Sequence, residues 1–281
     1  MLFKKYLGIV FFFLLLSSAC VSASPPRKEK PIVIVVVSYN NTKWVDLNIE
    51  SIFSQNYNNY RVVYIDDCSP DGTADAVQAL VDRLGQQHRF TLVRNTTRAG
   101  SPLANHYKAI HEYCKDNEII ACLDGDDWLA NSKVLNVINE YYSNYDIWLT
   151  HGSLKEYHKN NRNGTIGWSI PVPQKIISSN TFRLFRCPTH LKTFYAWLFK
   201  KIKLEDLMYE GKFFPATGDQ AMMFPMVEMA GTRHKFIPKI LYIYNMSNPL
   251  GESIVATQLQ MDCEAYIRSL QPYAPLKKAG R

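Results

Sequence analysis

Three carboxylates, Asp124, Asp126 and Asp127, lie within four residues of one another. They directly follow the apolar run 120–123, a pattern typical of a buried strand and the loop that leaves it. Carboxylates this close repel one another, and folding alone gives no reason to place them there. A hard cation such as Mg²⁺ or Mn²⁺ prefers oxygen ligands and would remove the repulsion. An isolated Asp-x-Asp is more often a solvated acidic turn, so the interpretation depends on the rest of the chain.

The elements that would position these carboxylates alternate between strand and helix four times. Buried apolar runs predict strands over 32–37, 61–65, 90–93 and 118–123. Apolar residues at helical spacing predict helices over 43–54, 74–84, 102–115 and 134–142. This alternation predicts an α/β fold, with a mostly parallel central sheet and helices on both faces.

The pattern loosens after residue 150. The stretch 151–175 is polar, contains glycines and prolines, and predicts loops and short strands. An apolar run over 221–230 predicts a helix with Pro225 in or near its first turn. The run 235–245 predicts a closing strand. We expect one half of the domain at 31–130, a second half at 131–250 and a C-terminal tail at 251–281.

Three polar clusters follow predicted strands of this sheet: 38–41, 66–71 and 124–127. In doubly wound sheets, ligands bind beyond the carboxyl ends of the strands. We therefore expect the three clusters to converge on one edge of the sheet.

Several classes of protein are excluded or disfavoured. The chain has no phosphate-binding P-loop motif, no G-x-G-x-x-G after its first strand and no G-x-S-x-G nucleophile elbow. The formal net charge is +7, but the 32 lysines and arginines are scattered. We therefore expect no nucleic-acid partner. A modest positive excess suits an enzyme that handles a phosphorylated substrate.

The N-terminus has the pattern of a targeting segment. Two early lysines, an apolar run over 7–16 and small residues before Ser24 predict a signal peptide over 1–23. The alternative is an uncleaved signal anchor, although the run is short for a membrane span. The prolines and charges over 24–30 indicate a linker. We expect the protein in the lumen of the secretory pathway or exported, or alternatively anchored to a membrane by this segment.

Four motifs now occur in order. They are Ile32–Asn40 (IVIVVVSYN), Ser51–Tyr57 (SIFSQNY), Ile65–Thr73 (IDDCSPDGT) and Leu123–Asp127 (LDGDD). Together they resemble a glycosyltransferase of family 2 with the A-type fold. The resemblance covers roughly residues 31–130, and Gly218-Asp219-Gln220 extends it more weakly. It implies that 31–130 binds the nucleotide sugar and that 131–250 binds the acceptor and carries the catalytic base.

The resemblance implies roles for individual residues. Asp219 matches the family's catalytic base, and Asp126 and Asp127 would hold the ribose and a Mn²⁺ or Mg²⁺ ion that bridges the diphosphate. Which of the three acids touches the metal stays open. The other residues implied to bind the nucleotide sugar are Ser38, Asn40, Asp66, Asp67, Arg98, Asp124 and Asp126, with Asp67 on the base and Asp66 either on the base or orienting its loop.

These residue types suit an inverting, metal-dependent transfer from a nucleotide-diphospho-sugar, expected to be a UDP-sugar, to an acceptor hydroxyl on a glycan, protein or lipid. A cation would neutralise the leaving diphosphate, and a carboxylate would deprotonate the acceptor. Asp219 could instead be a plain helix N-cap. His190 could line an acceptor groove, although a core or surface role is the better expectation. A catalytically silent nucleotide- or carbohydrate-binding protein of the same fold is the functional alternative.

Overall fold

The computed structural model describes residues 28–159, 166–167, 169–249 and 257–278. The expected signal segment 1–23 lies outside these residues. None of the helices in the described ranges combines the length and the apolar character that a bilayer crossing requires.

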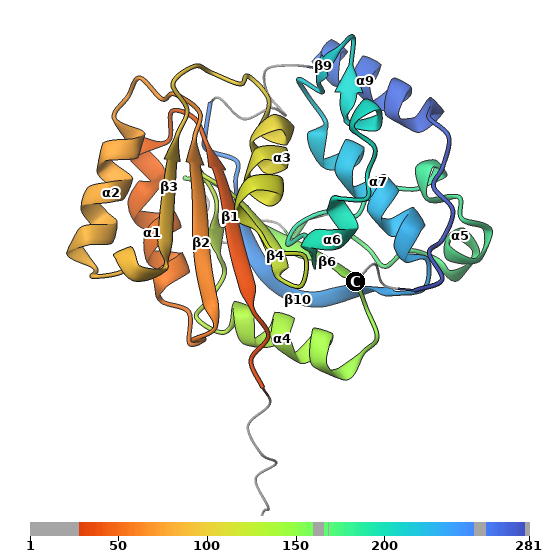
Figure 1. Cartoon of the computed structure of the whole chain (residues 1–281), viewed down its shortest axis with the longest axis horizontal. Helices are drawn as coiled ribbons and strands as arrows, with labels where there is room; N and C mark the ends of the chain where they lie inside the picture. Colours follow the sequence, from red (N-terminus) through yellow and green to blue (C-terminus); the bar gives the residue numbers. More distant parts are fainter. Residues whose placement is uncertain (1–27, 160–165, 168, 250–256, 279–281) are drawn as a thin grey trace, which may run out of the picture.

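One eight-stranded sheet runs through the molecule (Figure 1). Strands β1, β2, β3 and β4 are mutually parallel, β6 and β10 are parallel to each other, and β7 and β5 pair antiparallel with their neighbours. In spatial order the strands are β3 (Phe90–Arg94), β2 (Tyr60–Asp66), β1 (Ile32–Ser38), β4 (Ile119–Asp124), β7 (Thr193–Tyr195), β6 (Leu149–Tyr157), β10 (His234–Asn245) and β5 (Trp128–Leu129). The expected mostly parallel sheet is confirmed.

Helices cover both faces of the sheet, as expected. One face buries apolar side chains of α1 (Val45–Phe53), α2 (Thr73–Arg83) and α4 (Val134–Asn144). The other face is covered by α3 (Pro102–Tyr113), α6 (Ala196–Phe199), α7 (Gly218–Ala230) and α9 (Thr257–Ser269). The remaining elements are α5 (Gln174–Ser179), the short 3-10 turns η1 (Thr42–Trp44), η2 (Gln87–Arg89), η3 (Phe182–Leu184) and η4 (Leu204–Leu207), and the hairpin β8 (Met208–Tyr209) and β9 (Lys212–Phe213).

Two local expectations were wrong. The stretch expected to hold loops and short strands contains most of the nine-residue strand β6, which pairs with β10 and β7 and fully buries polar residues such as Thr150 and His151. Pro225 lies in the interior of α7, because this helix begins at Gly218 rather than at residue 221. Long-range pairing explains β6, since its own sequence lacks the apolar pattern of a strand.

The segment expected as a C-terminal tail contributes to the core. Helix α9 buries Cys263 and Ile267, and it lies in the same apolar cluster as α7. Glu228 of α7, fully buried, accepts hydrogen bonds from Arg183 at 2.7 and 3.0 Å and from the backbone of Tyr273 at 2.9 Å. The C-terminal segment is therefore tied to the helix that begins with Gly218 and Asp219.

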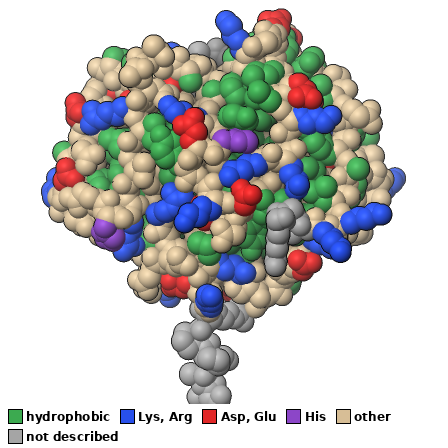
Figure 2. Space-filling view, in the orientation of Figure 1, with side chains coloured by type: hydrophobic (Ala, Val, Ile, Leu, Met, Phe, Trp, Pro, Cys, Tyr) green, Lys and Arg blue, Asp and Glu red, His purple; other side chains and the backbone are tan. Residues whose placement is uncertain are grey.

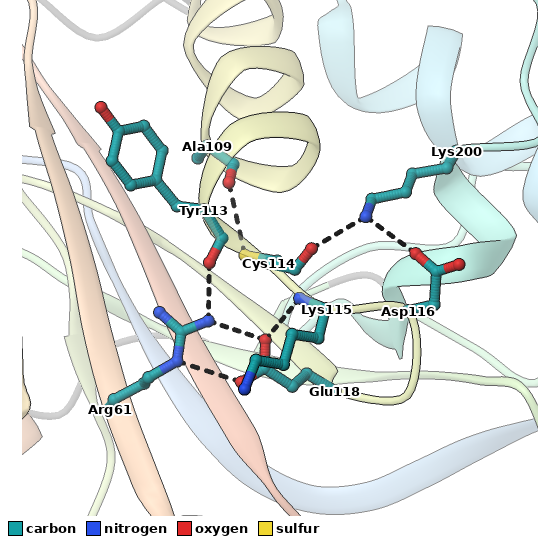
Figure 3. Close-up of polar contacts among 8 residues, drawn as sticks. All are labelled: Arg61, Ala109, Tyr113, Cys114, Lys115, Asp116, Glu118 and Lys200. Atoms are coloured by element: carbon teal, nitrogen blue, oxygen red, sulfur yellow. Dashed lines mark hydrogen bonds and ion pairs between the residues drawn. The ribbon is translucent and has the colours of Figure 1, made fainter.

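Hydrogen bonds from charged side chains hold the C-terminal end of α3 in place (Figure 3). Arg61, from β2, contacts both carboxylate oxygens of Glu118 at 3.0 and 2.7 Å and donates to the carbonyl of Tyr113 at 2.7 Å. Lys200 donates to the carbonyl of Cys114 at 2.8 Å. Cationic side chains thus satisfy carbonyls at the C-terminal end of this helix, which is where positive charge is favourable. The helix is fixed at the edge opposite the carboxyl ends of β1 to β4.

Candidate active site

The polar clusters after β1, β2 and β4 lie side by side. Ser38 is the register partner of Asp66, and Val37 is the register partner of Asp124. The backbone amides of Asp67 and Gly125 donate to the carbonyls of Ser38 and Val37 at 2.8 and 2.9 Å. Parallel pairing therefore brings the three loops to one edge, as the strand pattern predicts.

Close approach of two of these loops requires a glycine. A Cβ atom at Gly125 would lie 2.3 Å from Ser38 Oγ and 2.8 Å from Asn41 Nδ2. Neighbouring side chains would have to move to admit it. The glycine inside the acidic motif therefore sets the distance between the β1 and β4 loops.

The β1 loop is organised by hydrogen bonds to the β2 loop. Asn40 adopts a left-handed backbone conformation with φ of 56°, and its amide donates to Ser69 Oγ at 3.0 Å. Asn41 donates to Ser38 Oγ at 3.1 Å. Among the described residues, the buried Oδ1 of Asn40 has no hydrogen-bond partner, so it remains an acceptor for a ligand.

Asp66 and Asp67 differ in what their oxygens contact. Asp67 accepts from Asn95 and from the backbone amides of Ala99 and Gly100, at 2.8, 2.8 and 3.1 Å. It therefore orients the loop between β3 and α3. Asp66 accepts from the amide of Ser69 through Oδ2, and its buried Oδ1 is without a partner in the described part of the chain.

Arg98 is placed by the same loop. Its guanidinium lies 3.6 Å from the ring centre of Tyr39, and its Nε is 4.0 Å from Asp67 Oδ2. The side chain is 56% exposed. A planar cation stacked on an aromatic ring beside the β1 loop offers both charge and a flat surface to a ligand.

The three acids of the β4 loop have different surroundings. Asp127 is 2% exposed, and its two oxygens accept from the Tyr242 hydroxyl at 2.6 Å and from the Asn245 amide at 2.7 Å. Asp126 accepts from Asn248 at 2.6 Å, and Asp124 contacts the Tyr242 hydroxyl at 3.1 Å. Both oxygens of Asp127 are thus bound by the protein itself.

Their pKa values diverge accordingly. Burial, with a further contribution from the charge of Asp124, raises the pKa of Asp126 to about 6. Burial and the charges of Asp126 and Asp124 raise the pKa of Asp127 well above its ordinary value. Burial alone would raise the pKa of Asp124 too, but the cation of Lys192 and other favourable contacts outweigh it, and the net shift is downward. The loop holds more negative charge than its protein neighbours neutralise.

Those shifts fit a divalent cation at Asp126, because a cation would relieve both its burial and its repulsion from Asp124. In the described ranges, no three His, Cys, Asp or Glu side chains are arranged to hold a metal by themselves. Oxygens of a bound diphosphate would have to complete the coordination, as is usual for Mg²⁺ in nucleotide sites.

Asp219 is the second residue of α7, and Thr217 occupies the cap position, so the plain N-cap alternative was wrong. Its Oδ1 accepts from the amide of Gln220 at 2.8 Å. The start of α7 lies against the start of α3: Ser101 Oγ donates to the carbonyl of Phe214 at 2.6 Å, and a Cβ on Gly218 would lie 2.9 Å from Leu103 Cβ.

A cavity of about 360 Å³ opens beside Asp219, lined by Arg186, Cys187, Thr189, Asp219, Gln220, Glu264 and Arg268. The charge of Asp219 raises the pKa of Lys192, and so does that of Asp124. The loop that leads into α3 donates to Asp67 at the carboxyl edge of the sheet, and α7 begins against the start of α3, so Asp219 lies at the same edge as the β4 loop.

Some residues of this site carry no signal in the sequence. Lys192 and His106 are buried beside Asp124, and Tyr242 and Asn245 hold Asp127 from more than a hundred residues away. His190 stacks on Tyr242, with ring centres 4.5 Å apart, and is buried rather than presented to a groove. The positions of Lys192, His190, Tyr242 and Asn245 depend on the pairing of β7 with β4 and β6 and of β10 with β6 and β5, which the sequence pattern alone does not specify.

Comparison with known proteins gives a consistent result. The family model described as glycosyl transferase family 2 matches residues 33–208, more than half of the chain. An uncharacterized glycosyltransferase from Haemophilus influenzae is 28% identical over 115 residues, which are 41% of this chain and 43% of that protein. This chain therefore aligns with less than half of that relative.

Solved structures share the fold. The mannosyltransferase PcManGT from Pyrobaculum calidifontis, in complex with GDP-Man and Mn²⁺, has a TM-score of 0.60 at 17% identity, covering 89% of this chain and 68% of that one. S. aureus TarS 1-349 in complex with UDP-GlcNAc has a TM-score of 0.58 at 15% identity, covering 84% and 66%. The resemblance noted in the four sequence motifs is confirmed, and the chain belongs to glycosyl transferase family 2.

Proposed function

We propose that this glycosyltransferase is inverting and metal-dependent, and that it moves a sugar from a nucleotide-diphospho-sugar to an acceptor hydroxyl. The observation that carries the proposal is that the acidic loop after β4 and the start of α7 lie at the same edge of the sheet. Asp124 is opposite Val37 in β1, and Gly218 packs against Leu103 at the start of α3. An acidic loop for the leaving diphosphate and a separate carboxylate for the acceptor are what a single displacement needs.

In this mechanism Asp219 accepts the proton of the acceptor hydroxyl. The acceptor oxygen forms its bond to the anomeric carbon as the bond from that carbon to the diphosphate oxygen breaks. One displacement inverts the configuration. Asp126, with Asp124 beside it, would hold Mn²⁺ or Mg²⁺, which when bound neutralises the diphosphate charge. Asp127 would keep the loop in place through Tyr242 and Asn245.

The nucleoside would lie over the β1 and β2 loops. Asp66 Oδ1 and Asn40 Oδ1 are buried acceptors without partners among the described residues, so they suit N–H groups of a base, whereas Asp67 would act by fixing the loop that carries Arg98. A UDP-sugar is our first choice of donor. Solved relatives of the same fold are bound to UDP-GlcNAc and to GDP-Man, so both nucleotides belong in the test.

The acceptor class is proposed as a hydroxyl on a glycan, protein or lipid. We further propose that the enzyme acts in a secretory lumen, is exported, or is held at a membrane by residues 1–23. Cell fractionation of the full-length chain, beside a chain that begins at residue 24, tests this. Equal distribution of the two chains in the cytosol would contradict it.

The activity is tested by incubating the protein with a panel of nucleotide sugars and Mn²⁺, and measuring release of the nucleoside diphosphate. Asp126→Asn and Asp219→Asn should each lower turnover by at least about 100-fold, the lower end of what a positioned acid or base contributes. Asp82→Asn, on the exposed surface of α2, is the matched control. Absence of metal-dependent turnover with every donor would favour the silent binding protein instead.

Figure 2 shows Lys and Arg side chains spread over one face of the molecule, with Asp and Glu among them. This face therefore presents no continuous basic patch to a polyanion. It supports a small phosphorylated donor as the partner to test first.

A further inference from the structure

Lys192 is a buried cation in the middle of the candidate site. It is 4% exposed and immediately precedes β7. Its carbonyl accepts from the amide of Cys122 at 3.1 Å, which continues the pairing of Ala121 with Thr193. Residues opposite each other in a sheet point to the same face. Lys192 therefore points to the face of Cys122, the face covered by α3 and α7.

The charges around Lys192 hold it in its cationic form. Burial alone would lower the pKa of Lys192, but the carboxylates of Asp219 and Asp124 more than offset burial and raise it. The neighbouring imidazoles do not add cations at neutral pH: burial lowers the pKa of His106 to about 4 and of His190 to about 3. Lys192 thus remains a cation under the influence of these two carboxylates.

The ammonium nevertheless lacks a direct partner. An ammonium carries three donors, yet among the described residues Lys192 makes no side-chain hydrogen bond and no ion pair within 4.0 Å. Lys192 Nζ is not among the fully shielded polar atoms that lack a partner in the described residues, so it keeps some access to solvent. The arrangement stabilises the cation at a distance and leaves its donors available to a ligand.

We infer that Lys192 contacts the transferred sugar, donating hydrogen bonds to its hydroxyl oxygens in the space between Asp124 and Asp219. The inference rests on the proposed function and names a residue that sets donor specificity. The diphosphate end is assigned to Asp126, so a group between Asp124 and the base faces the sugar ring rather than the phosphates.

The groups around this space suit the hydroxyls of a sugar ring. A sugar hydroxyl can accept from the ammonium of Lys192 and donate to a carboxylate at once. The transferred hexose or N-acetylhexosamine ring is therefore the part of the donor that Lys192 would contact.

The test compares binding of a nucleotide sugar with binding of the same nucleoside diphosphate without the sugar. UDP-GlcNAc against UDP, and GDP-mannose against GDP, are titrated calorimetrically in Mn²⁺ into wild type, Lys192→Met and Lys192→Gln. Loss of hydrogen bonds from a charged donor predicts an affinity for the active nucleotide sugar lower by about 10- to 100-fold. The affinity for the free diphosphate should change less than about twofold, a difference of only about 0.4 kcal/mol.

Lys200→Met is the matched control, because Lys200 is a partly buried lysine whose bonds lie at the opposite edge (Figure 3). The methionine variant of Lys192 keeps the volume but takes from Asp124 the cation that lowers its pKa, so circular dichroism must first show that the variant is folded. If it fails to fold, Lys192→Gln supplies the comparison. If the variant at Lys192 has a lower kcat with the nucleotide sugar but the same unfolding midpoint as wild type, Lys192 contacts the sugar. If the unfolding midpoint also falls, its role is structural.

Each outcome of these titrations either supports or contradicts the inference about Lys192. Equal losses for the nucleotide sugar and the free diphosphate would place Lys192 at the phosphates and overturn the inference. Unchanged binding of both would make it structural. If wild type binds and turns over no donor, the proposed function fails and the inference falls with it. If wild type is active and Lys192→Met keeps its donor affinity, only the inference fails.

Discussion

The hydroxyl oxygen of Tyr242 lies 2.6 Å from Asp127 Oδ2 and 3.1 Å from Asp124 Oδ2. It also accepts from the backbone amide of Asp124 at 3.2 Å. One phenol on β10 therefore holds both ends of the acidic loop that follows β4. The loop keeps its shape through a side chain 115 residues further along the chain.

Tyr242→Phe removes this hydroxyl and leaves a buried carboxylate oxygen unpaired. We expect the free energy of unfolding to fall by about 1–3 kcal/mol and Mn²⁺-dependent donor binding to weaken. Chemical denaturation and calorimetry measure the two effects. Tyr60→Phe, which loses one buried hydrogen bond to the Ile52 carbonyl, should affect stability alone. Unchanged donor binding in Tyr242→Phe would contradict the role assigned to the phenol.

Metal binding should follow the titration of Asp126, whose pKa is raised to about 6. The cation binds the carboxylate and competes with its proton. Affinity for Mn²⁺ in the presence of nucleoside diphosphate should be level above pH 6 and fall by about tenfold per pH unit below it. Calorimetric titrations between pH 5 and 7.5 check this, and a flat profile would exclude Asp126 as the ligand.

For the metal-free protein, the raised pKa of Asp126 predicts that the free energy of unfolding falls as the pH rises. The pKa of Asp126 is raised from 3.8 to about 6, so the folded state binds more protons than the unfolded state between these values. The corresponding stability is fully present below about pH 4 and is lost as the pH rises through 6. Asp126→Asn should remove this contribution from the pH profile of unfolding.

Gly125→Ala should disturb the site with a modest loss of stability. The added methyl would meet Ser38 Oγ at 2.3 Å, so the β1 loop must shift. We expect a loss of about 1–3 kcal/mol, as for an overpacked core, and donor affinity lower by at least about tenfold, equivalent to about 1.4 kcal/mol. Adding Ser38→Gly should restore part of the stability by making room. Wild-type donor affinity in Gly125→Ala would show that the two loops need not be this close.

The buried pair of Arg183 and Glu228 should contribute strongly to the integrity of α7. Their side chains are 5% and 0% exposed, so Arg183→Met leaves an uncompensated buried charge and should cost about 3–5 kcal/mol. The double variant with Glu228→Leu should recover much of that loss. Arg233→Met, whose partner Asp146 has an 83% exposed side chain, should cost no more than about 1 kcal/mol. Denaturant titrations of the variants compare these values.

The parts of this fold that could be predicted are those determined by local pattern. The β-branched run of β1 and the apolar helical spacing of α1 to α4 bury specific faces whatever the partner. Once β1, β2 and β4 are parallel, Ser38, Asp66 and Asp124 must meet at one edge. The local pattern therefore suffices to predict where the nucleotide end of the site lies.

The other half of the site depends on contacts distant in sequence. β6 buries Thr150 and His151 and has no strand pattern in its own sequence. It is a strand because it pairs with β7 on one side and β10 on the other. Asp127 is a predicted metal ligand by its position in the motif, but the hydrogen bonds that Tyr242 and Asn245 make to its two oxygens could not be predicted from the sequence. Lys192 gave no signal, because a lysine in a basic, aromatic stretch is ordinarily exposed.

Residues 28–31 are attached to the domain at the edge of the sheet opposite the candidate active site. Lys30 donates its amide to Asn139 at 3.0 Å and accepts from the Tyr57 hydroxyl at 2.7 Å, and Glu29 accepts from the amides of Asn58 and Asn59. These contacts lie where β1 begins, at the lower end of the strands in Figure 1. The active edge lies where β1 ends, seven residues and about 23 Å away. If the protein were attached to a surface through the residues before 28, the active edge would lie on the side of the sheet away from that surface. The length of the strands would then separate the surface from the place where an acceptor binds.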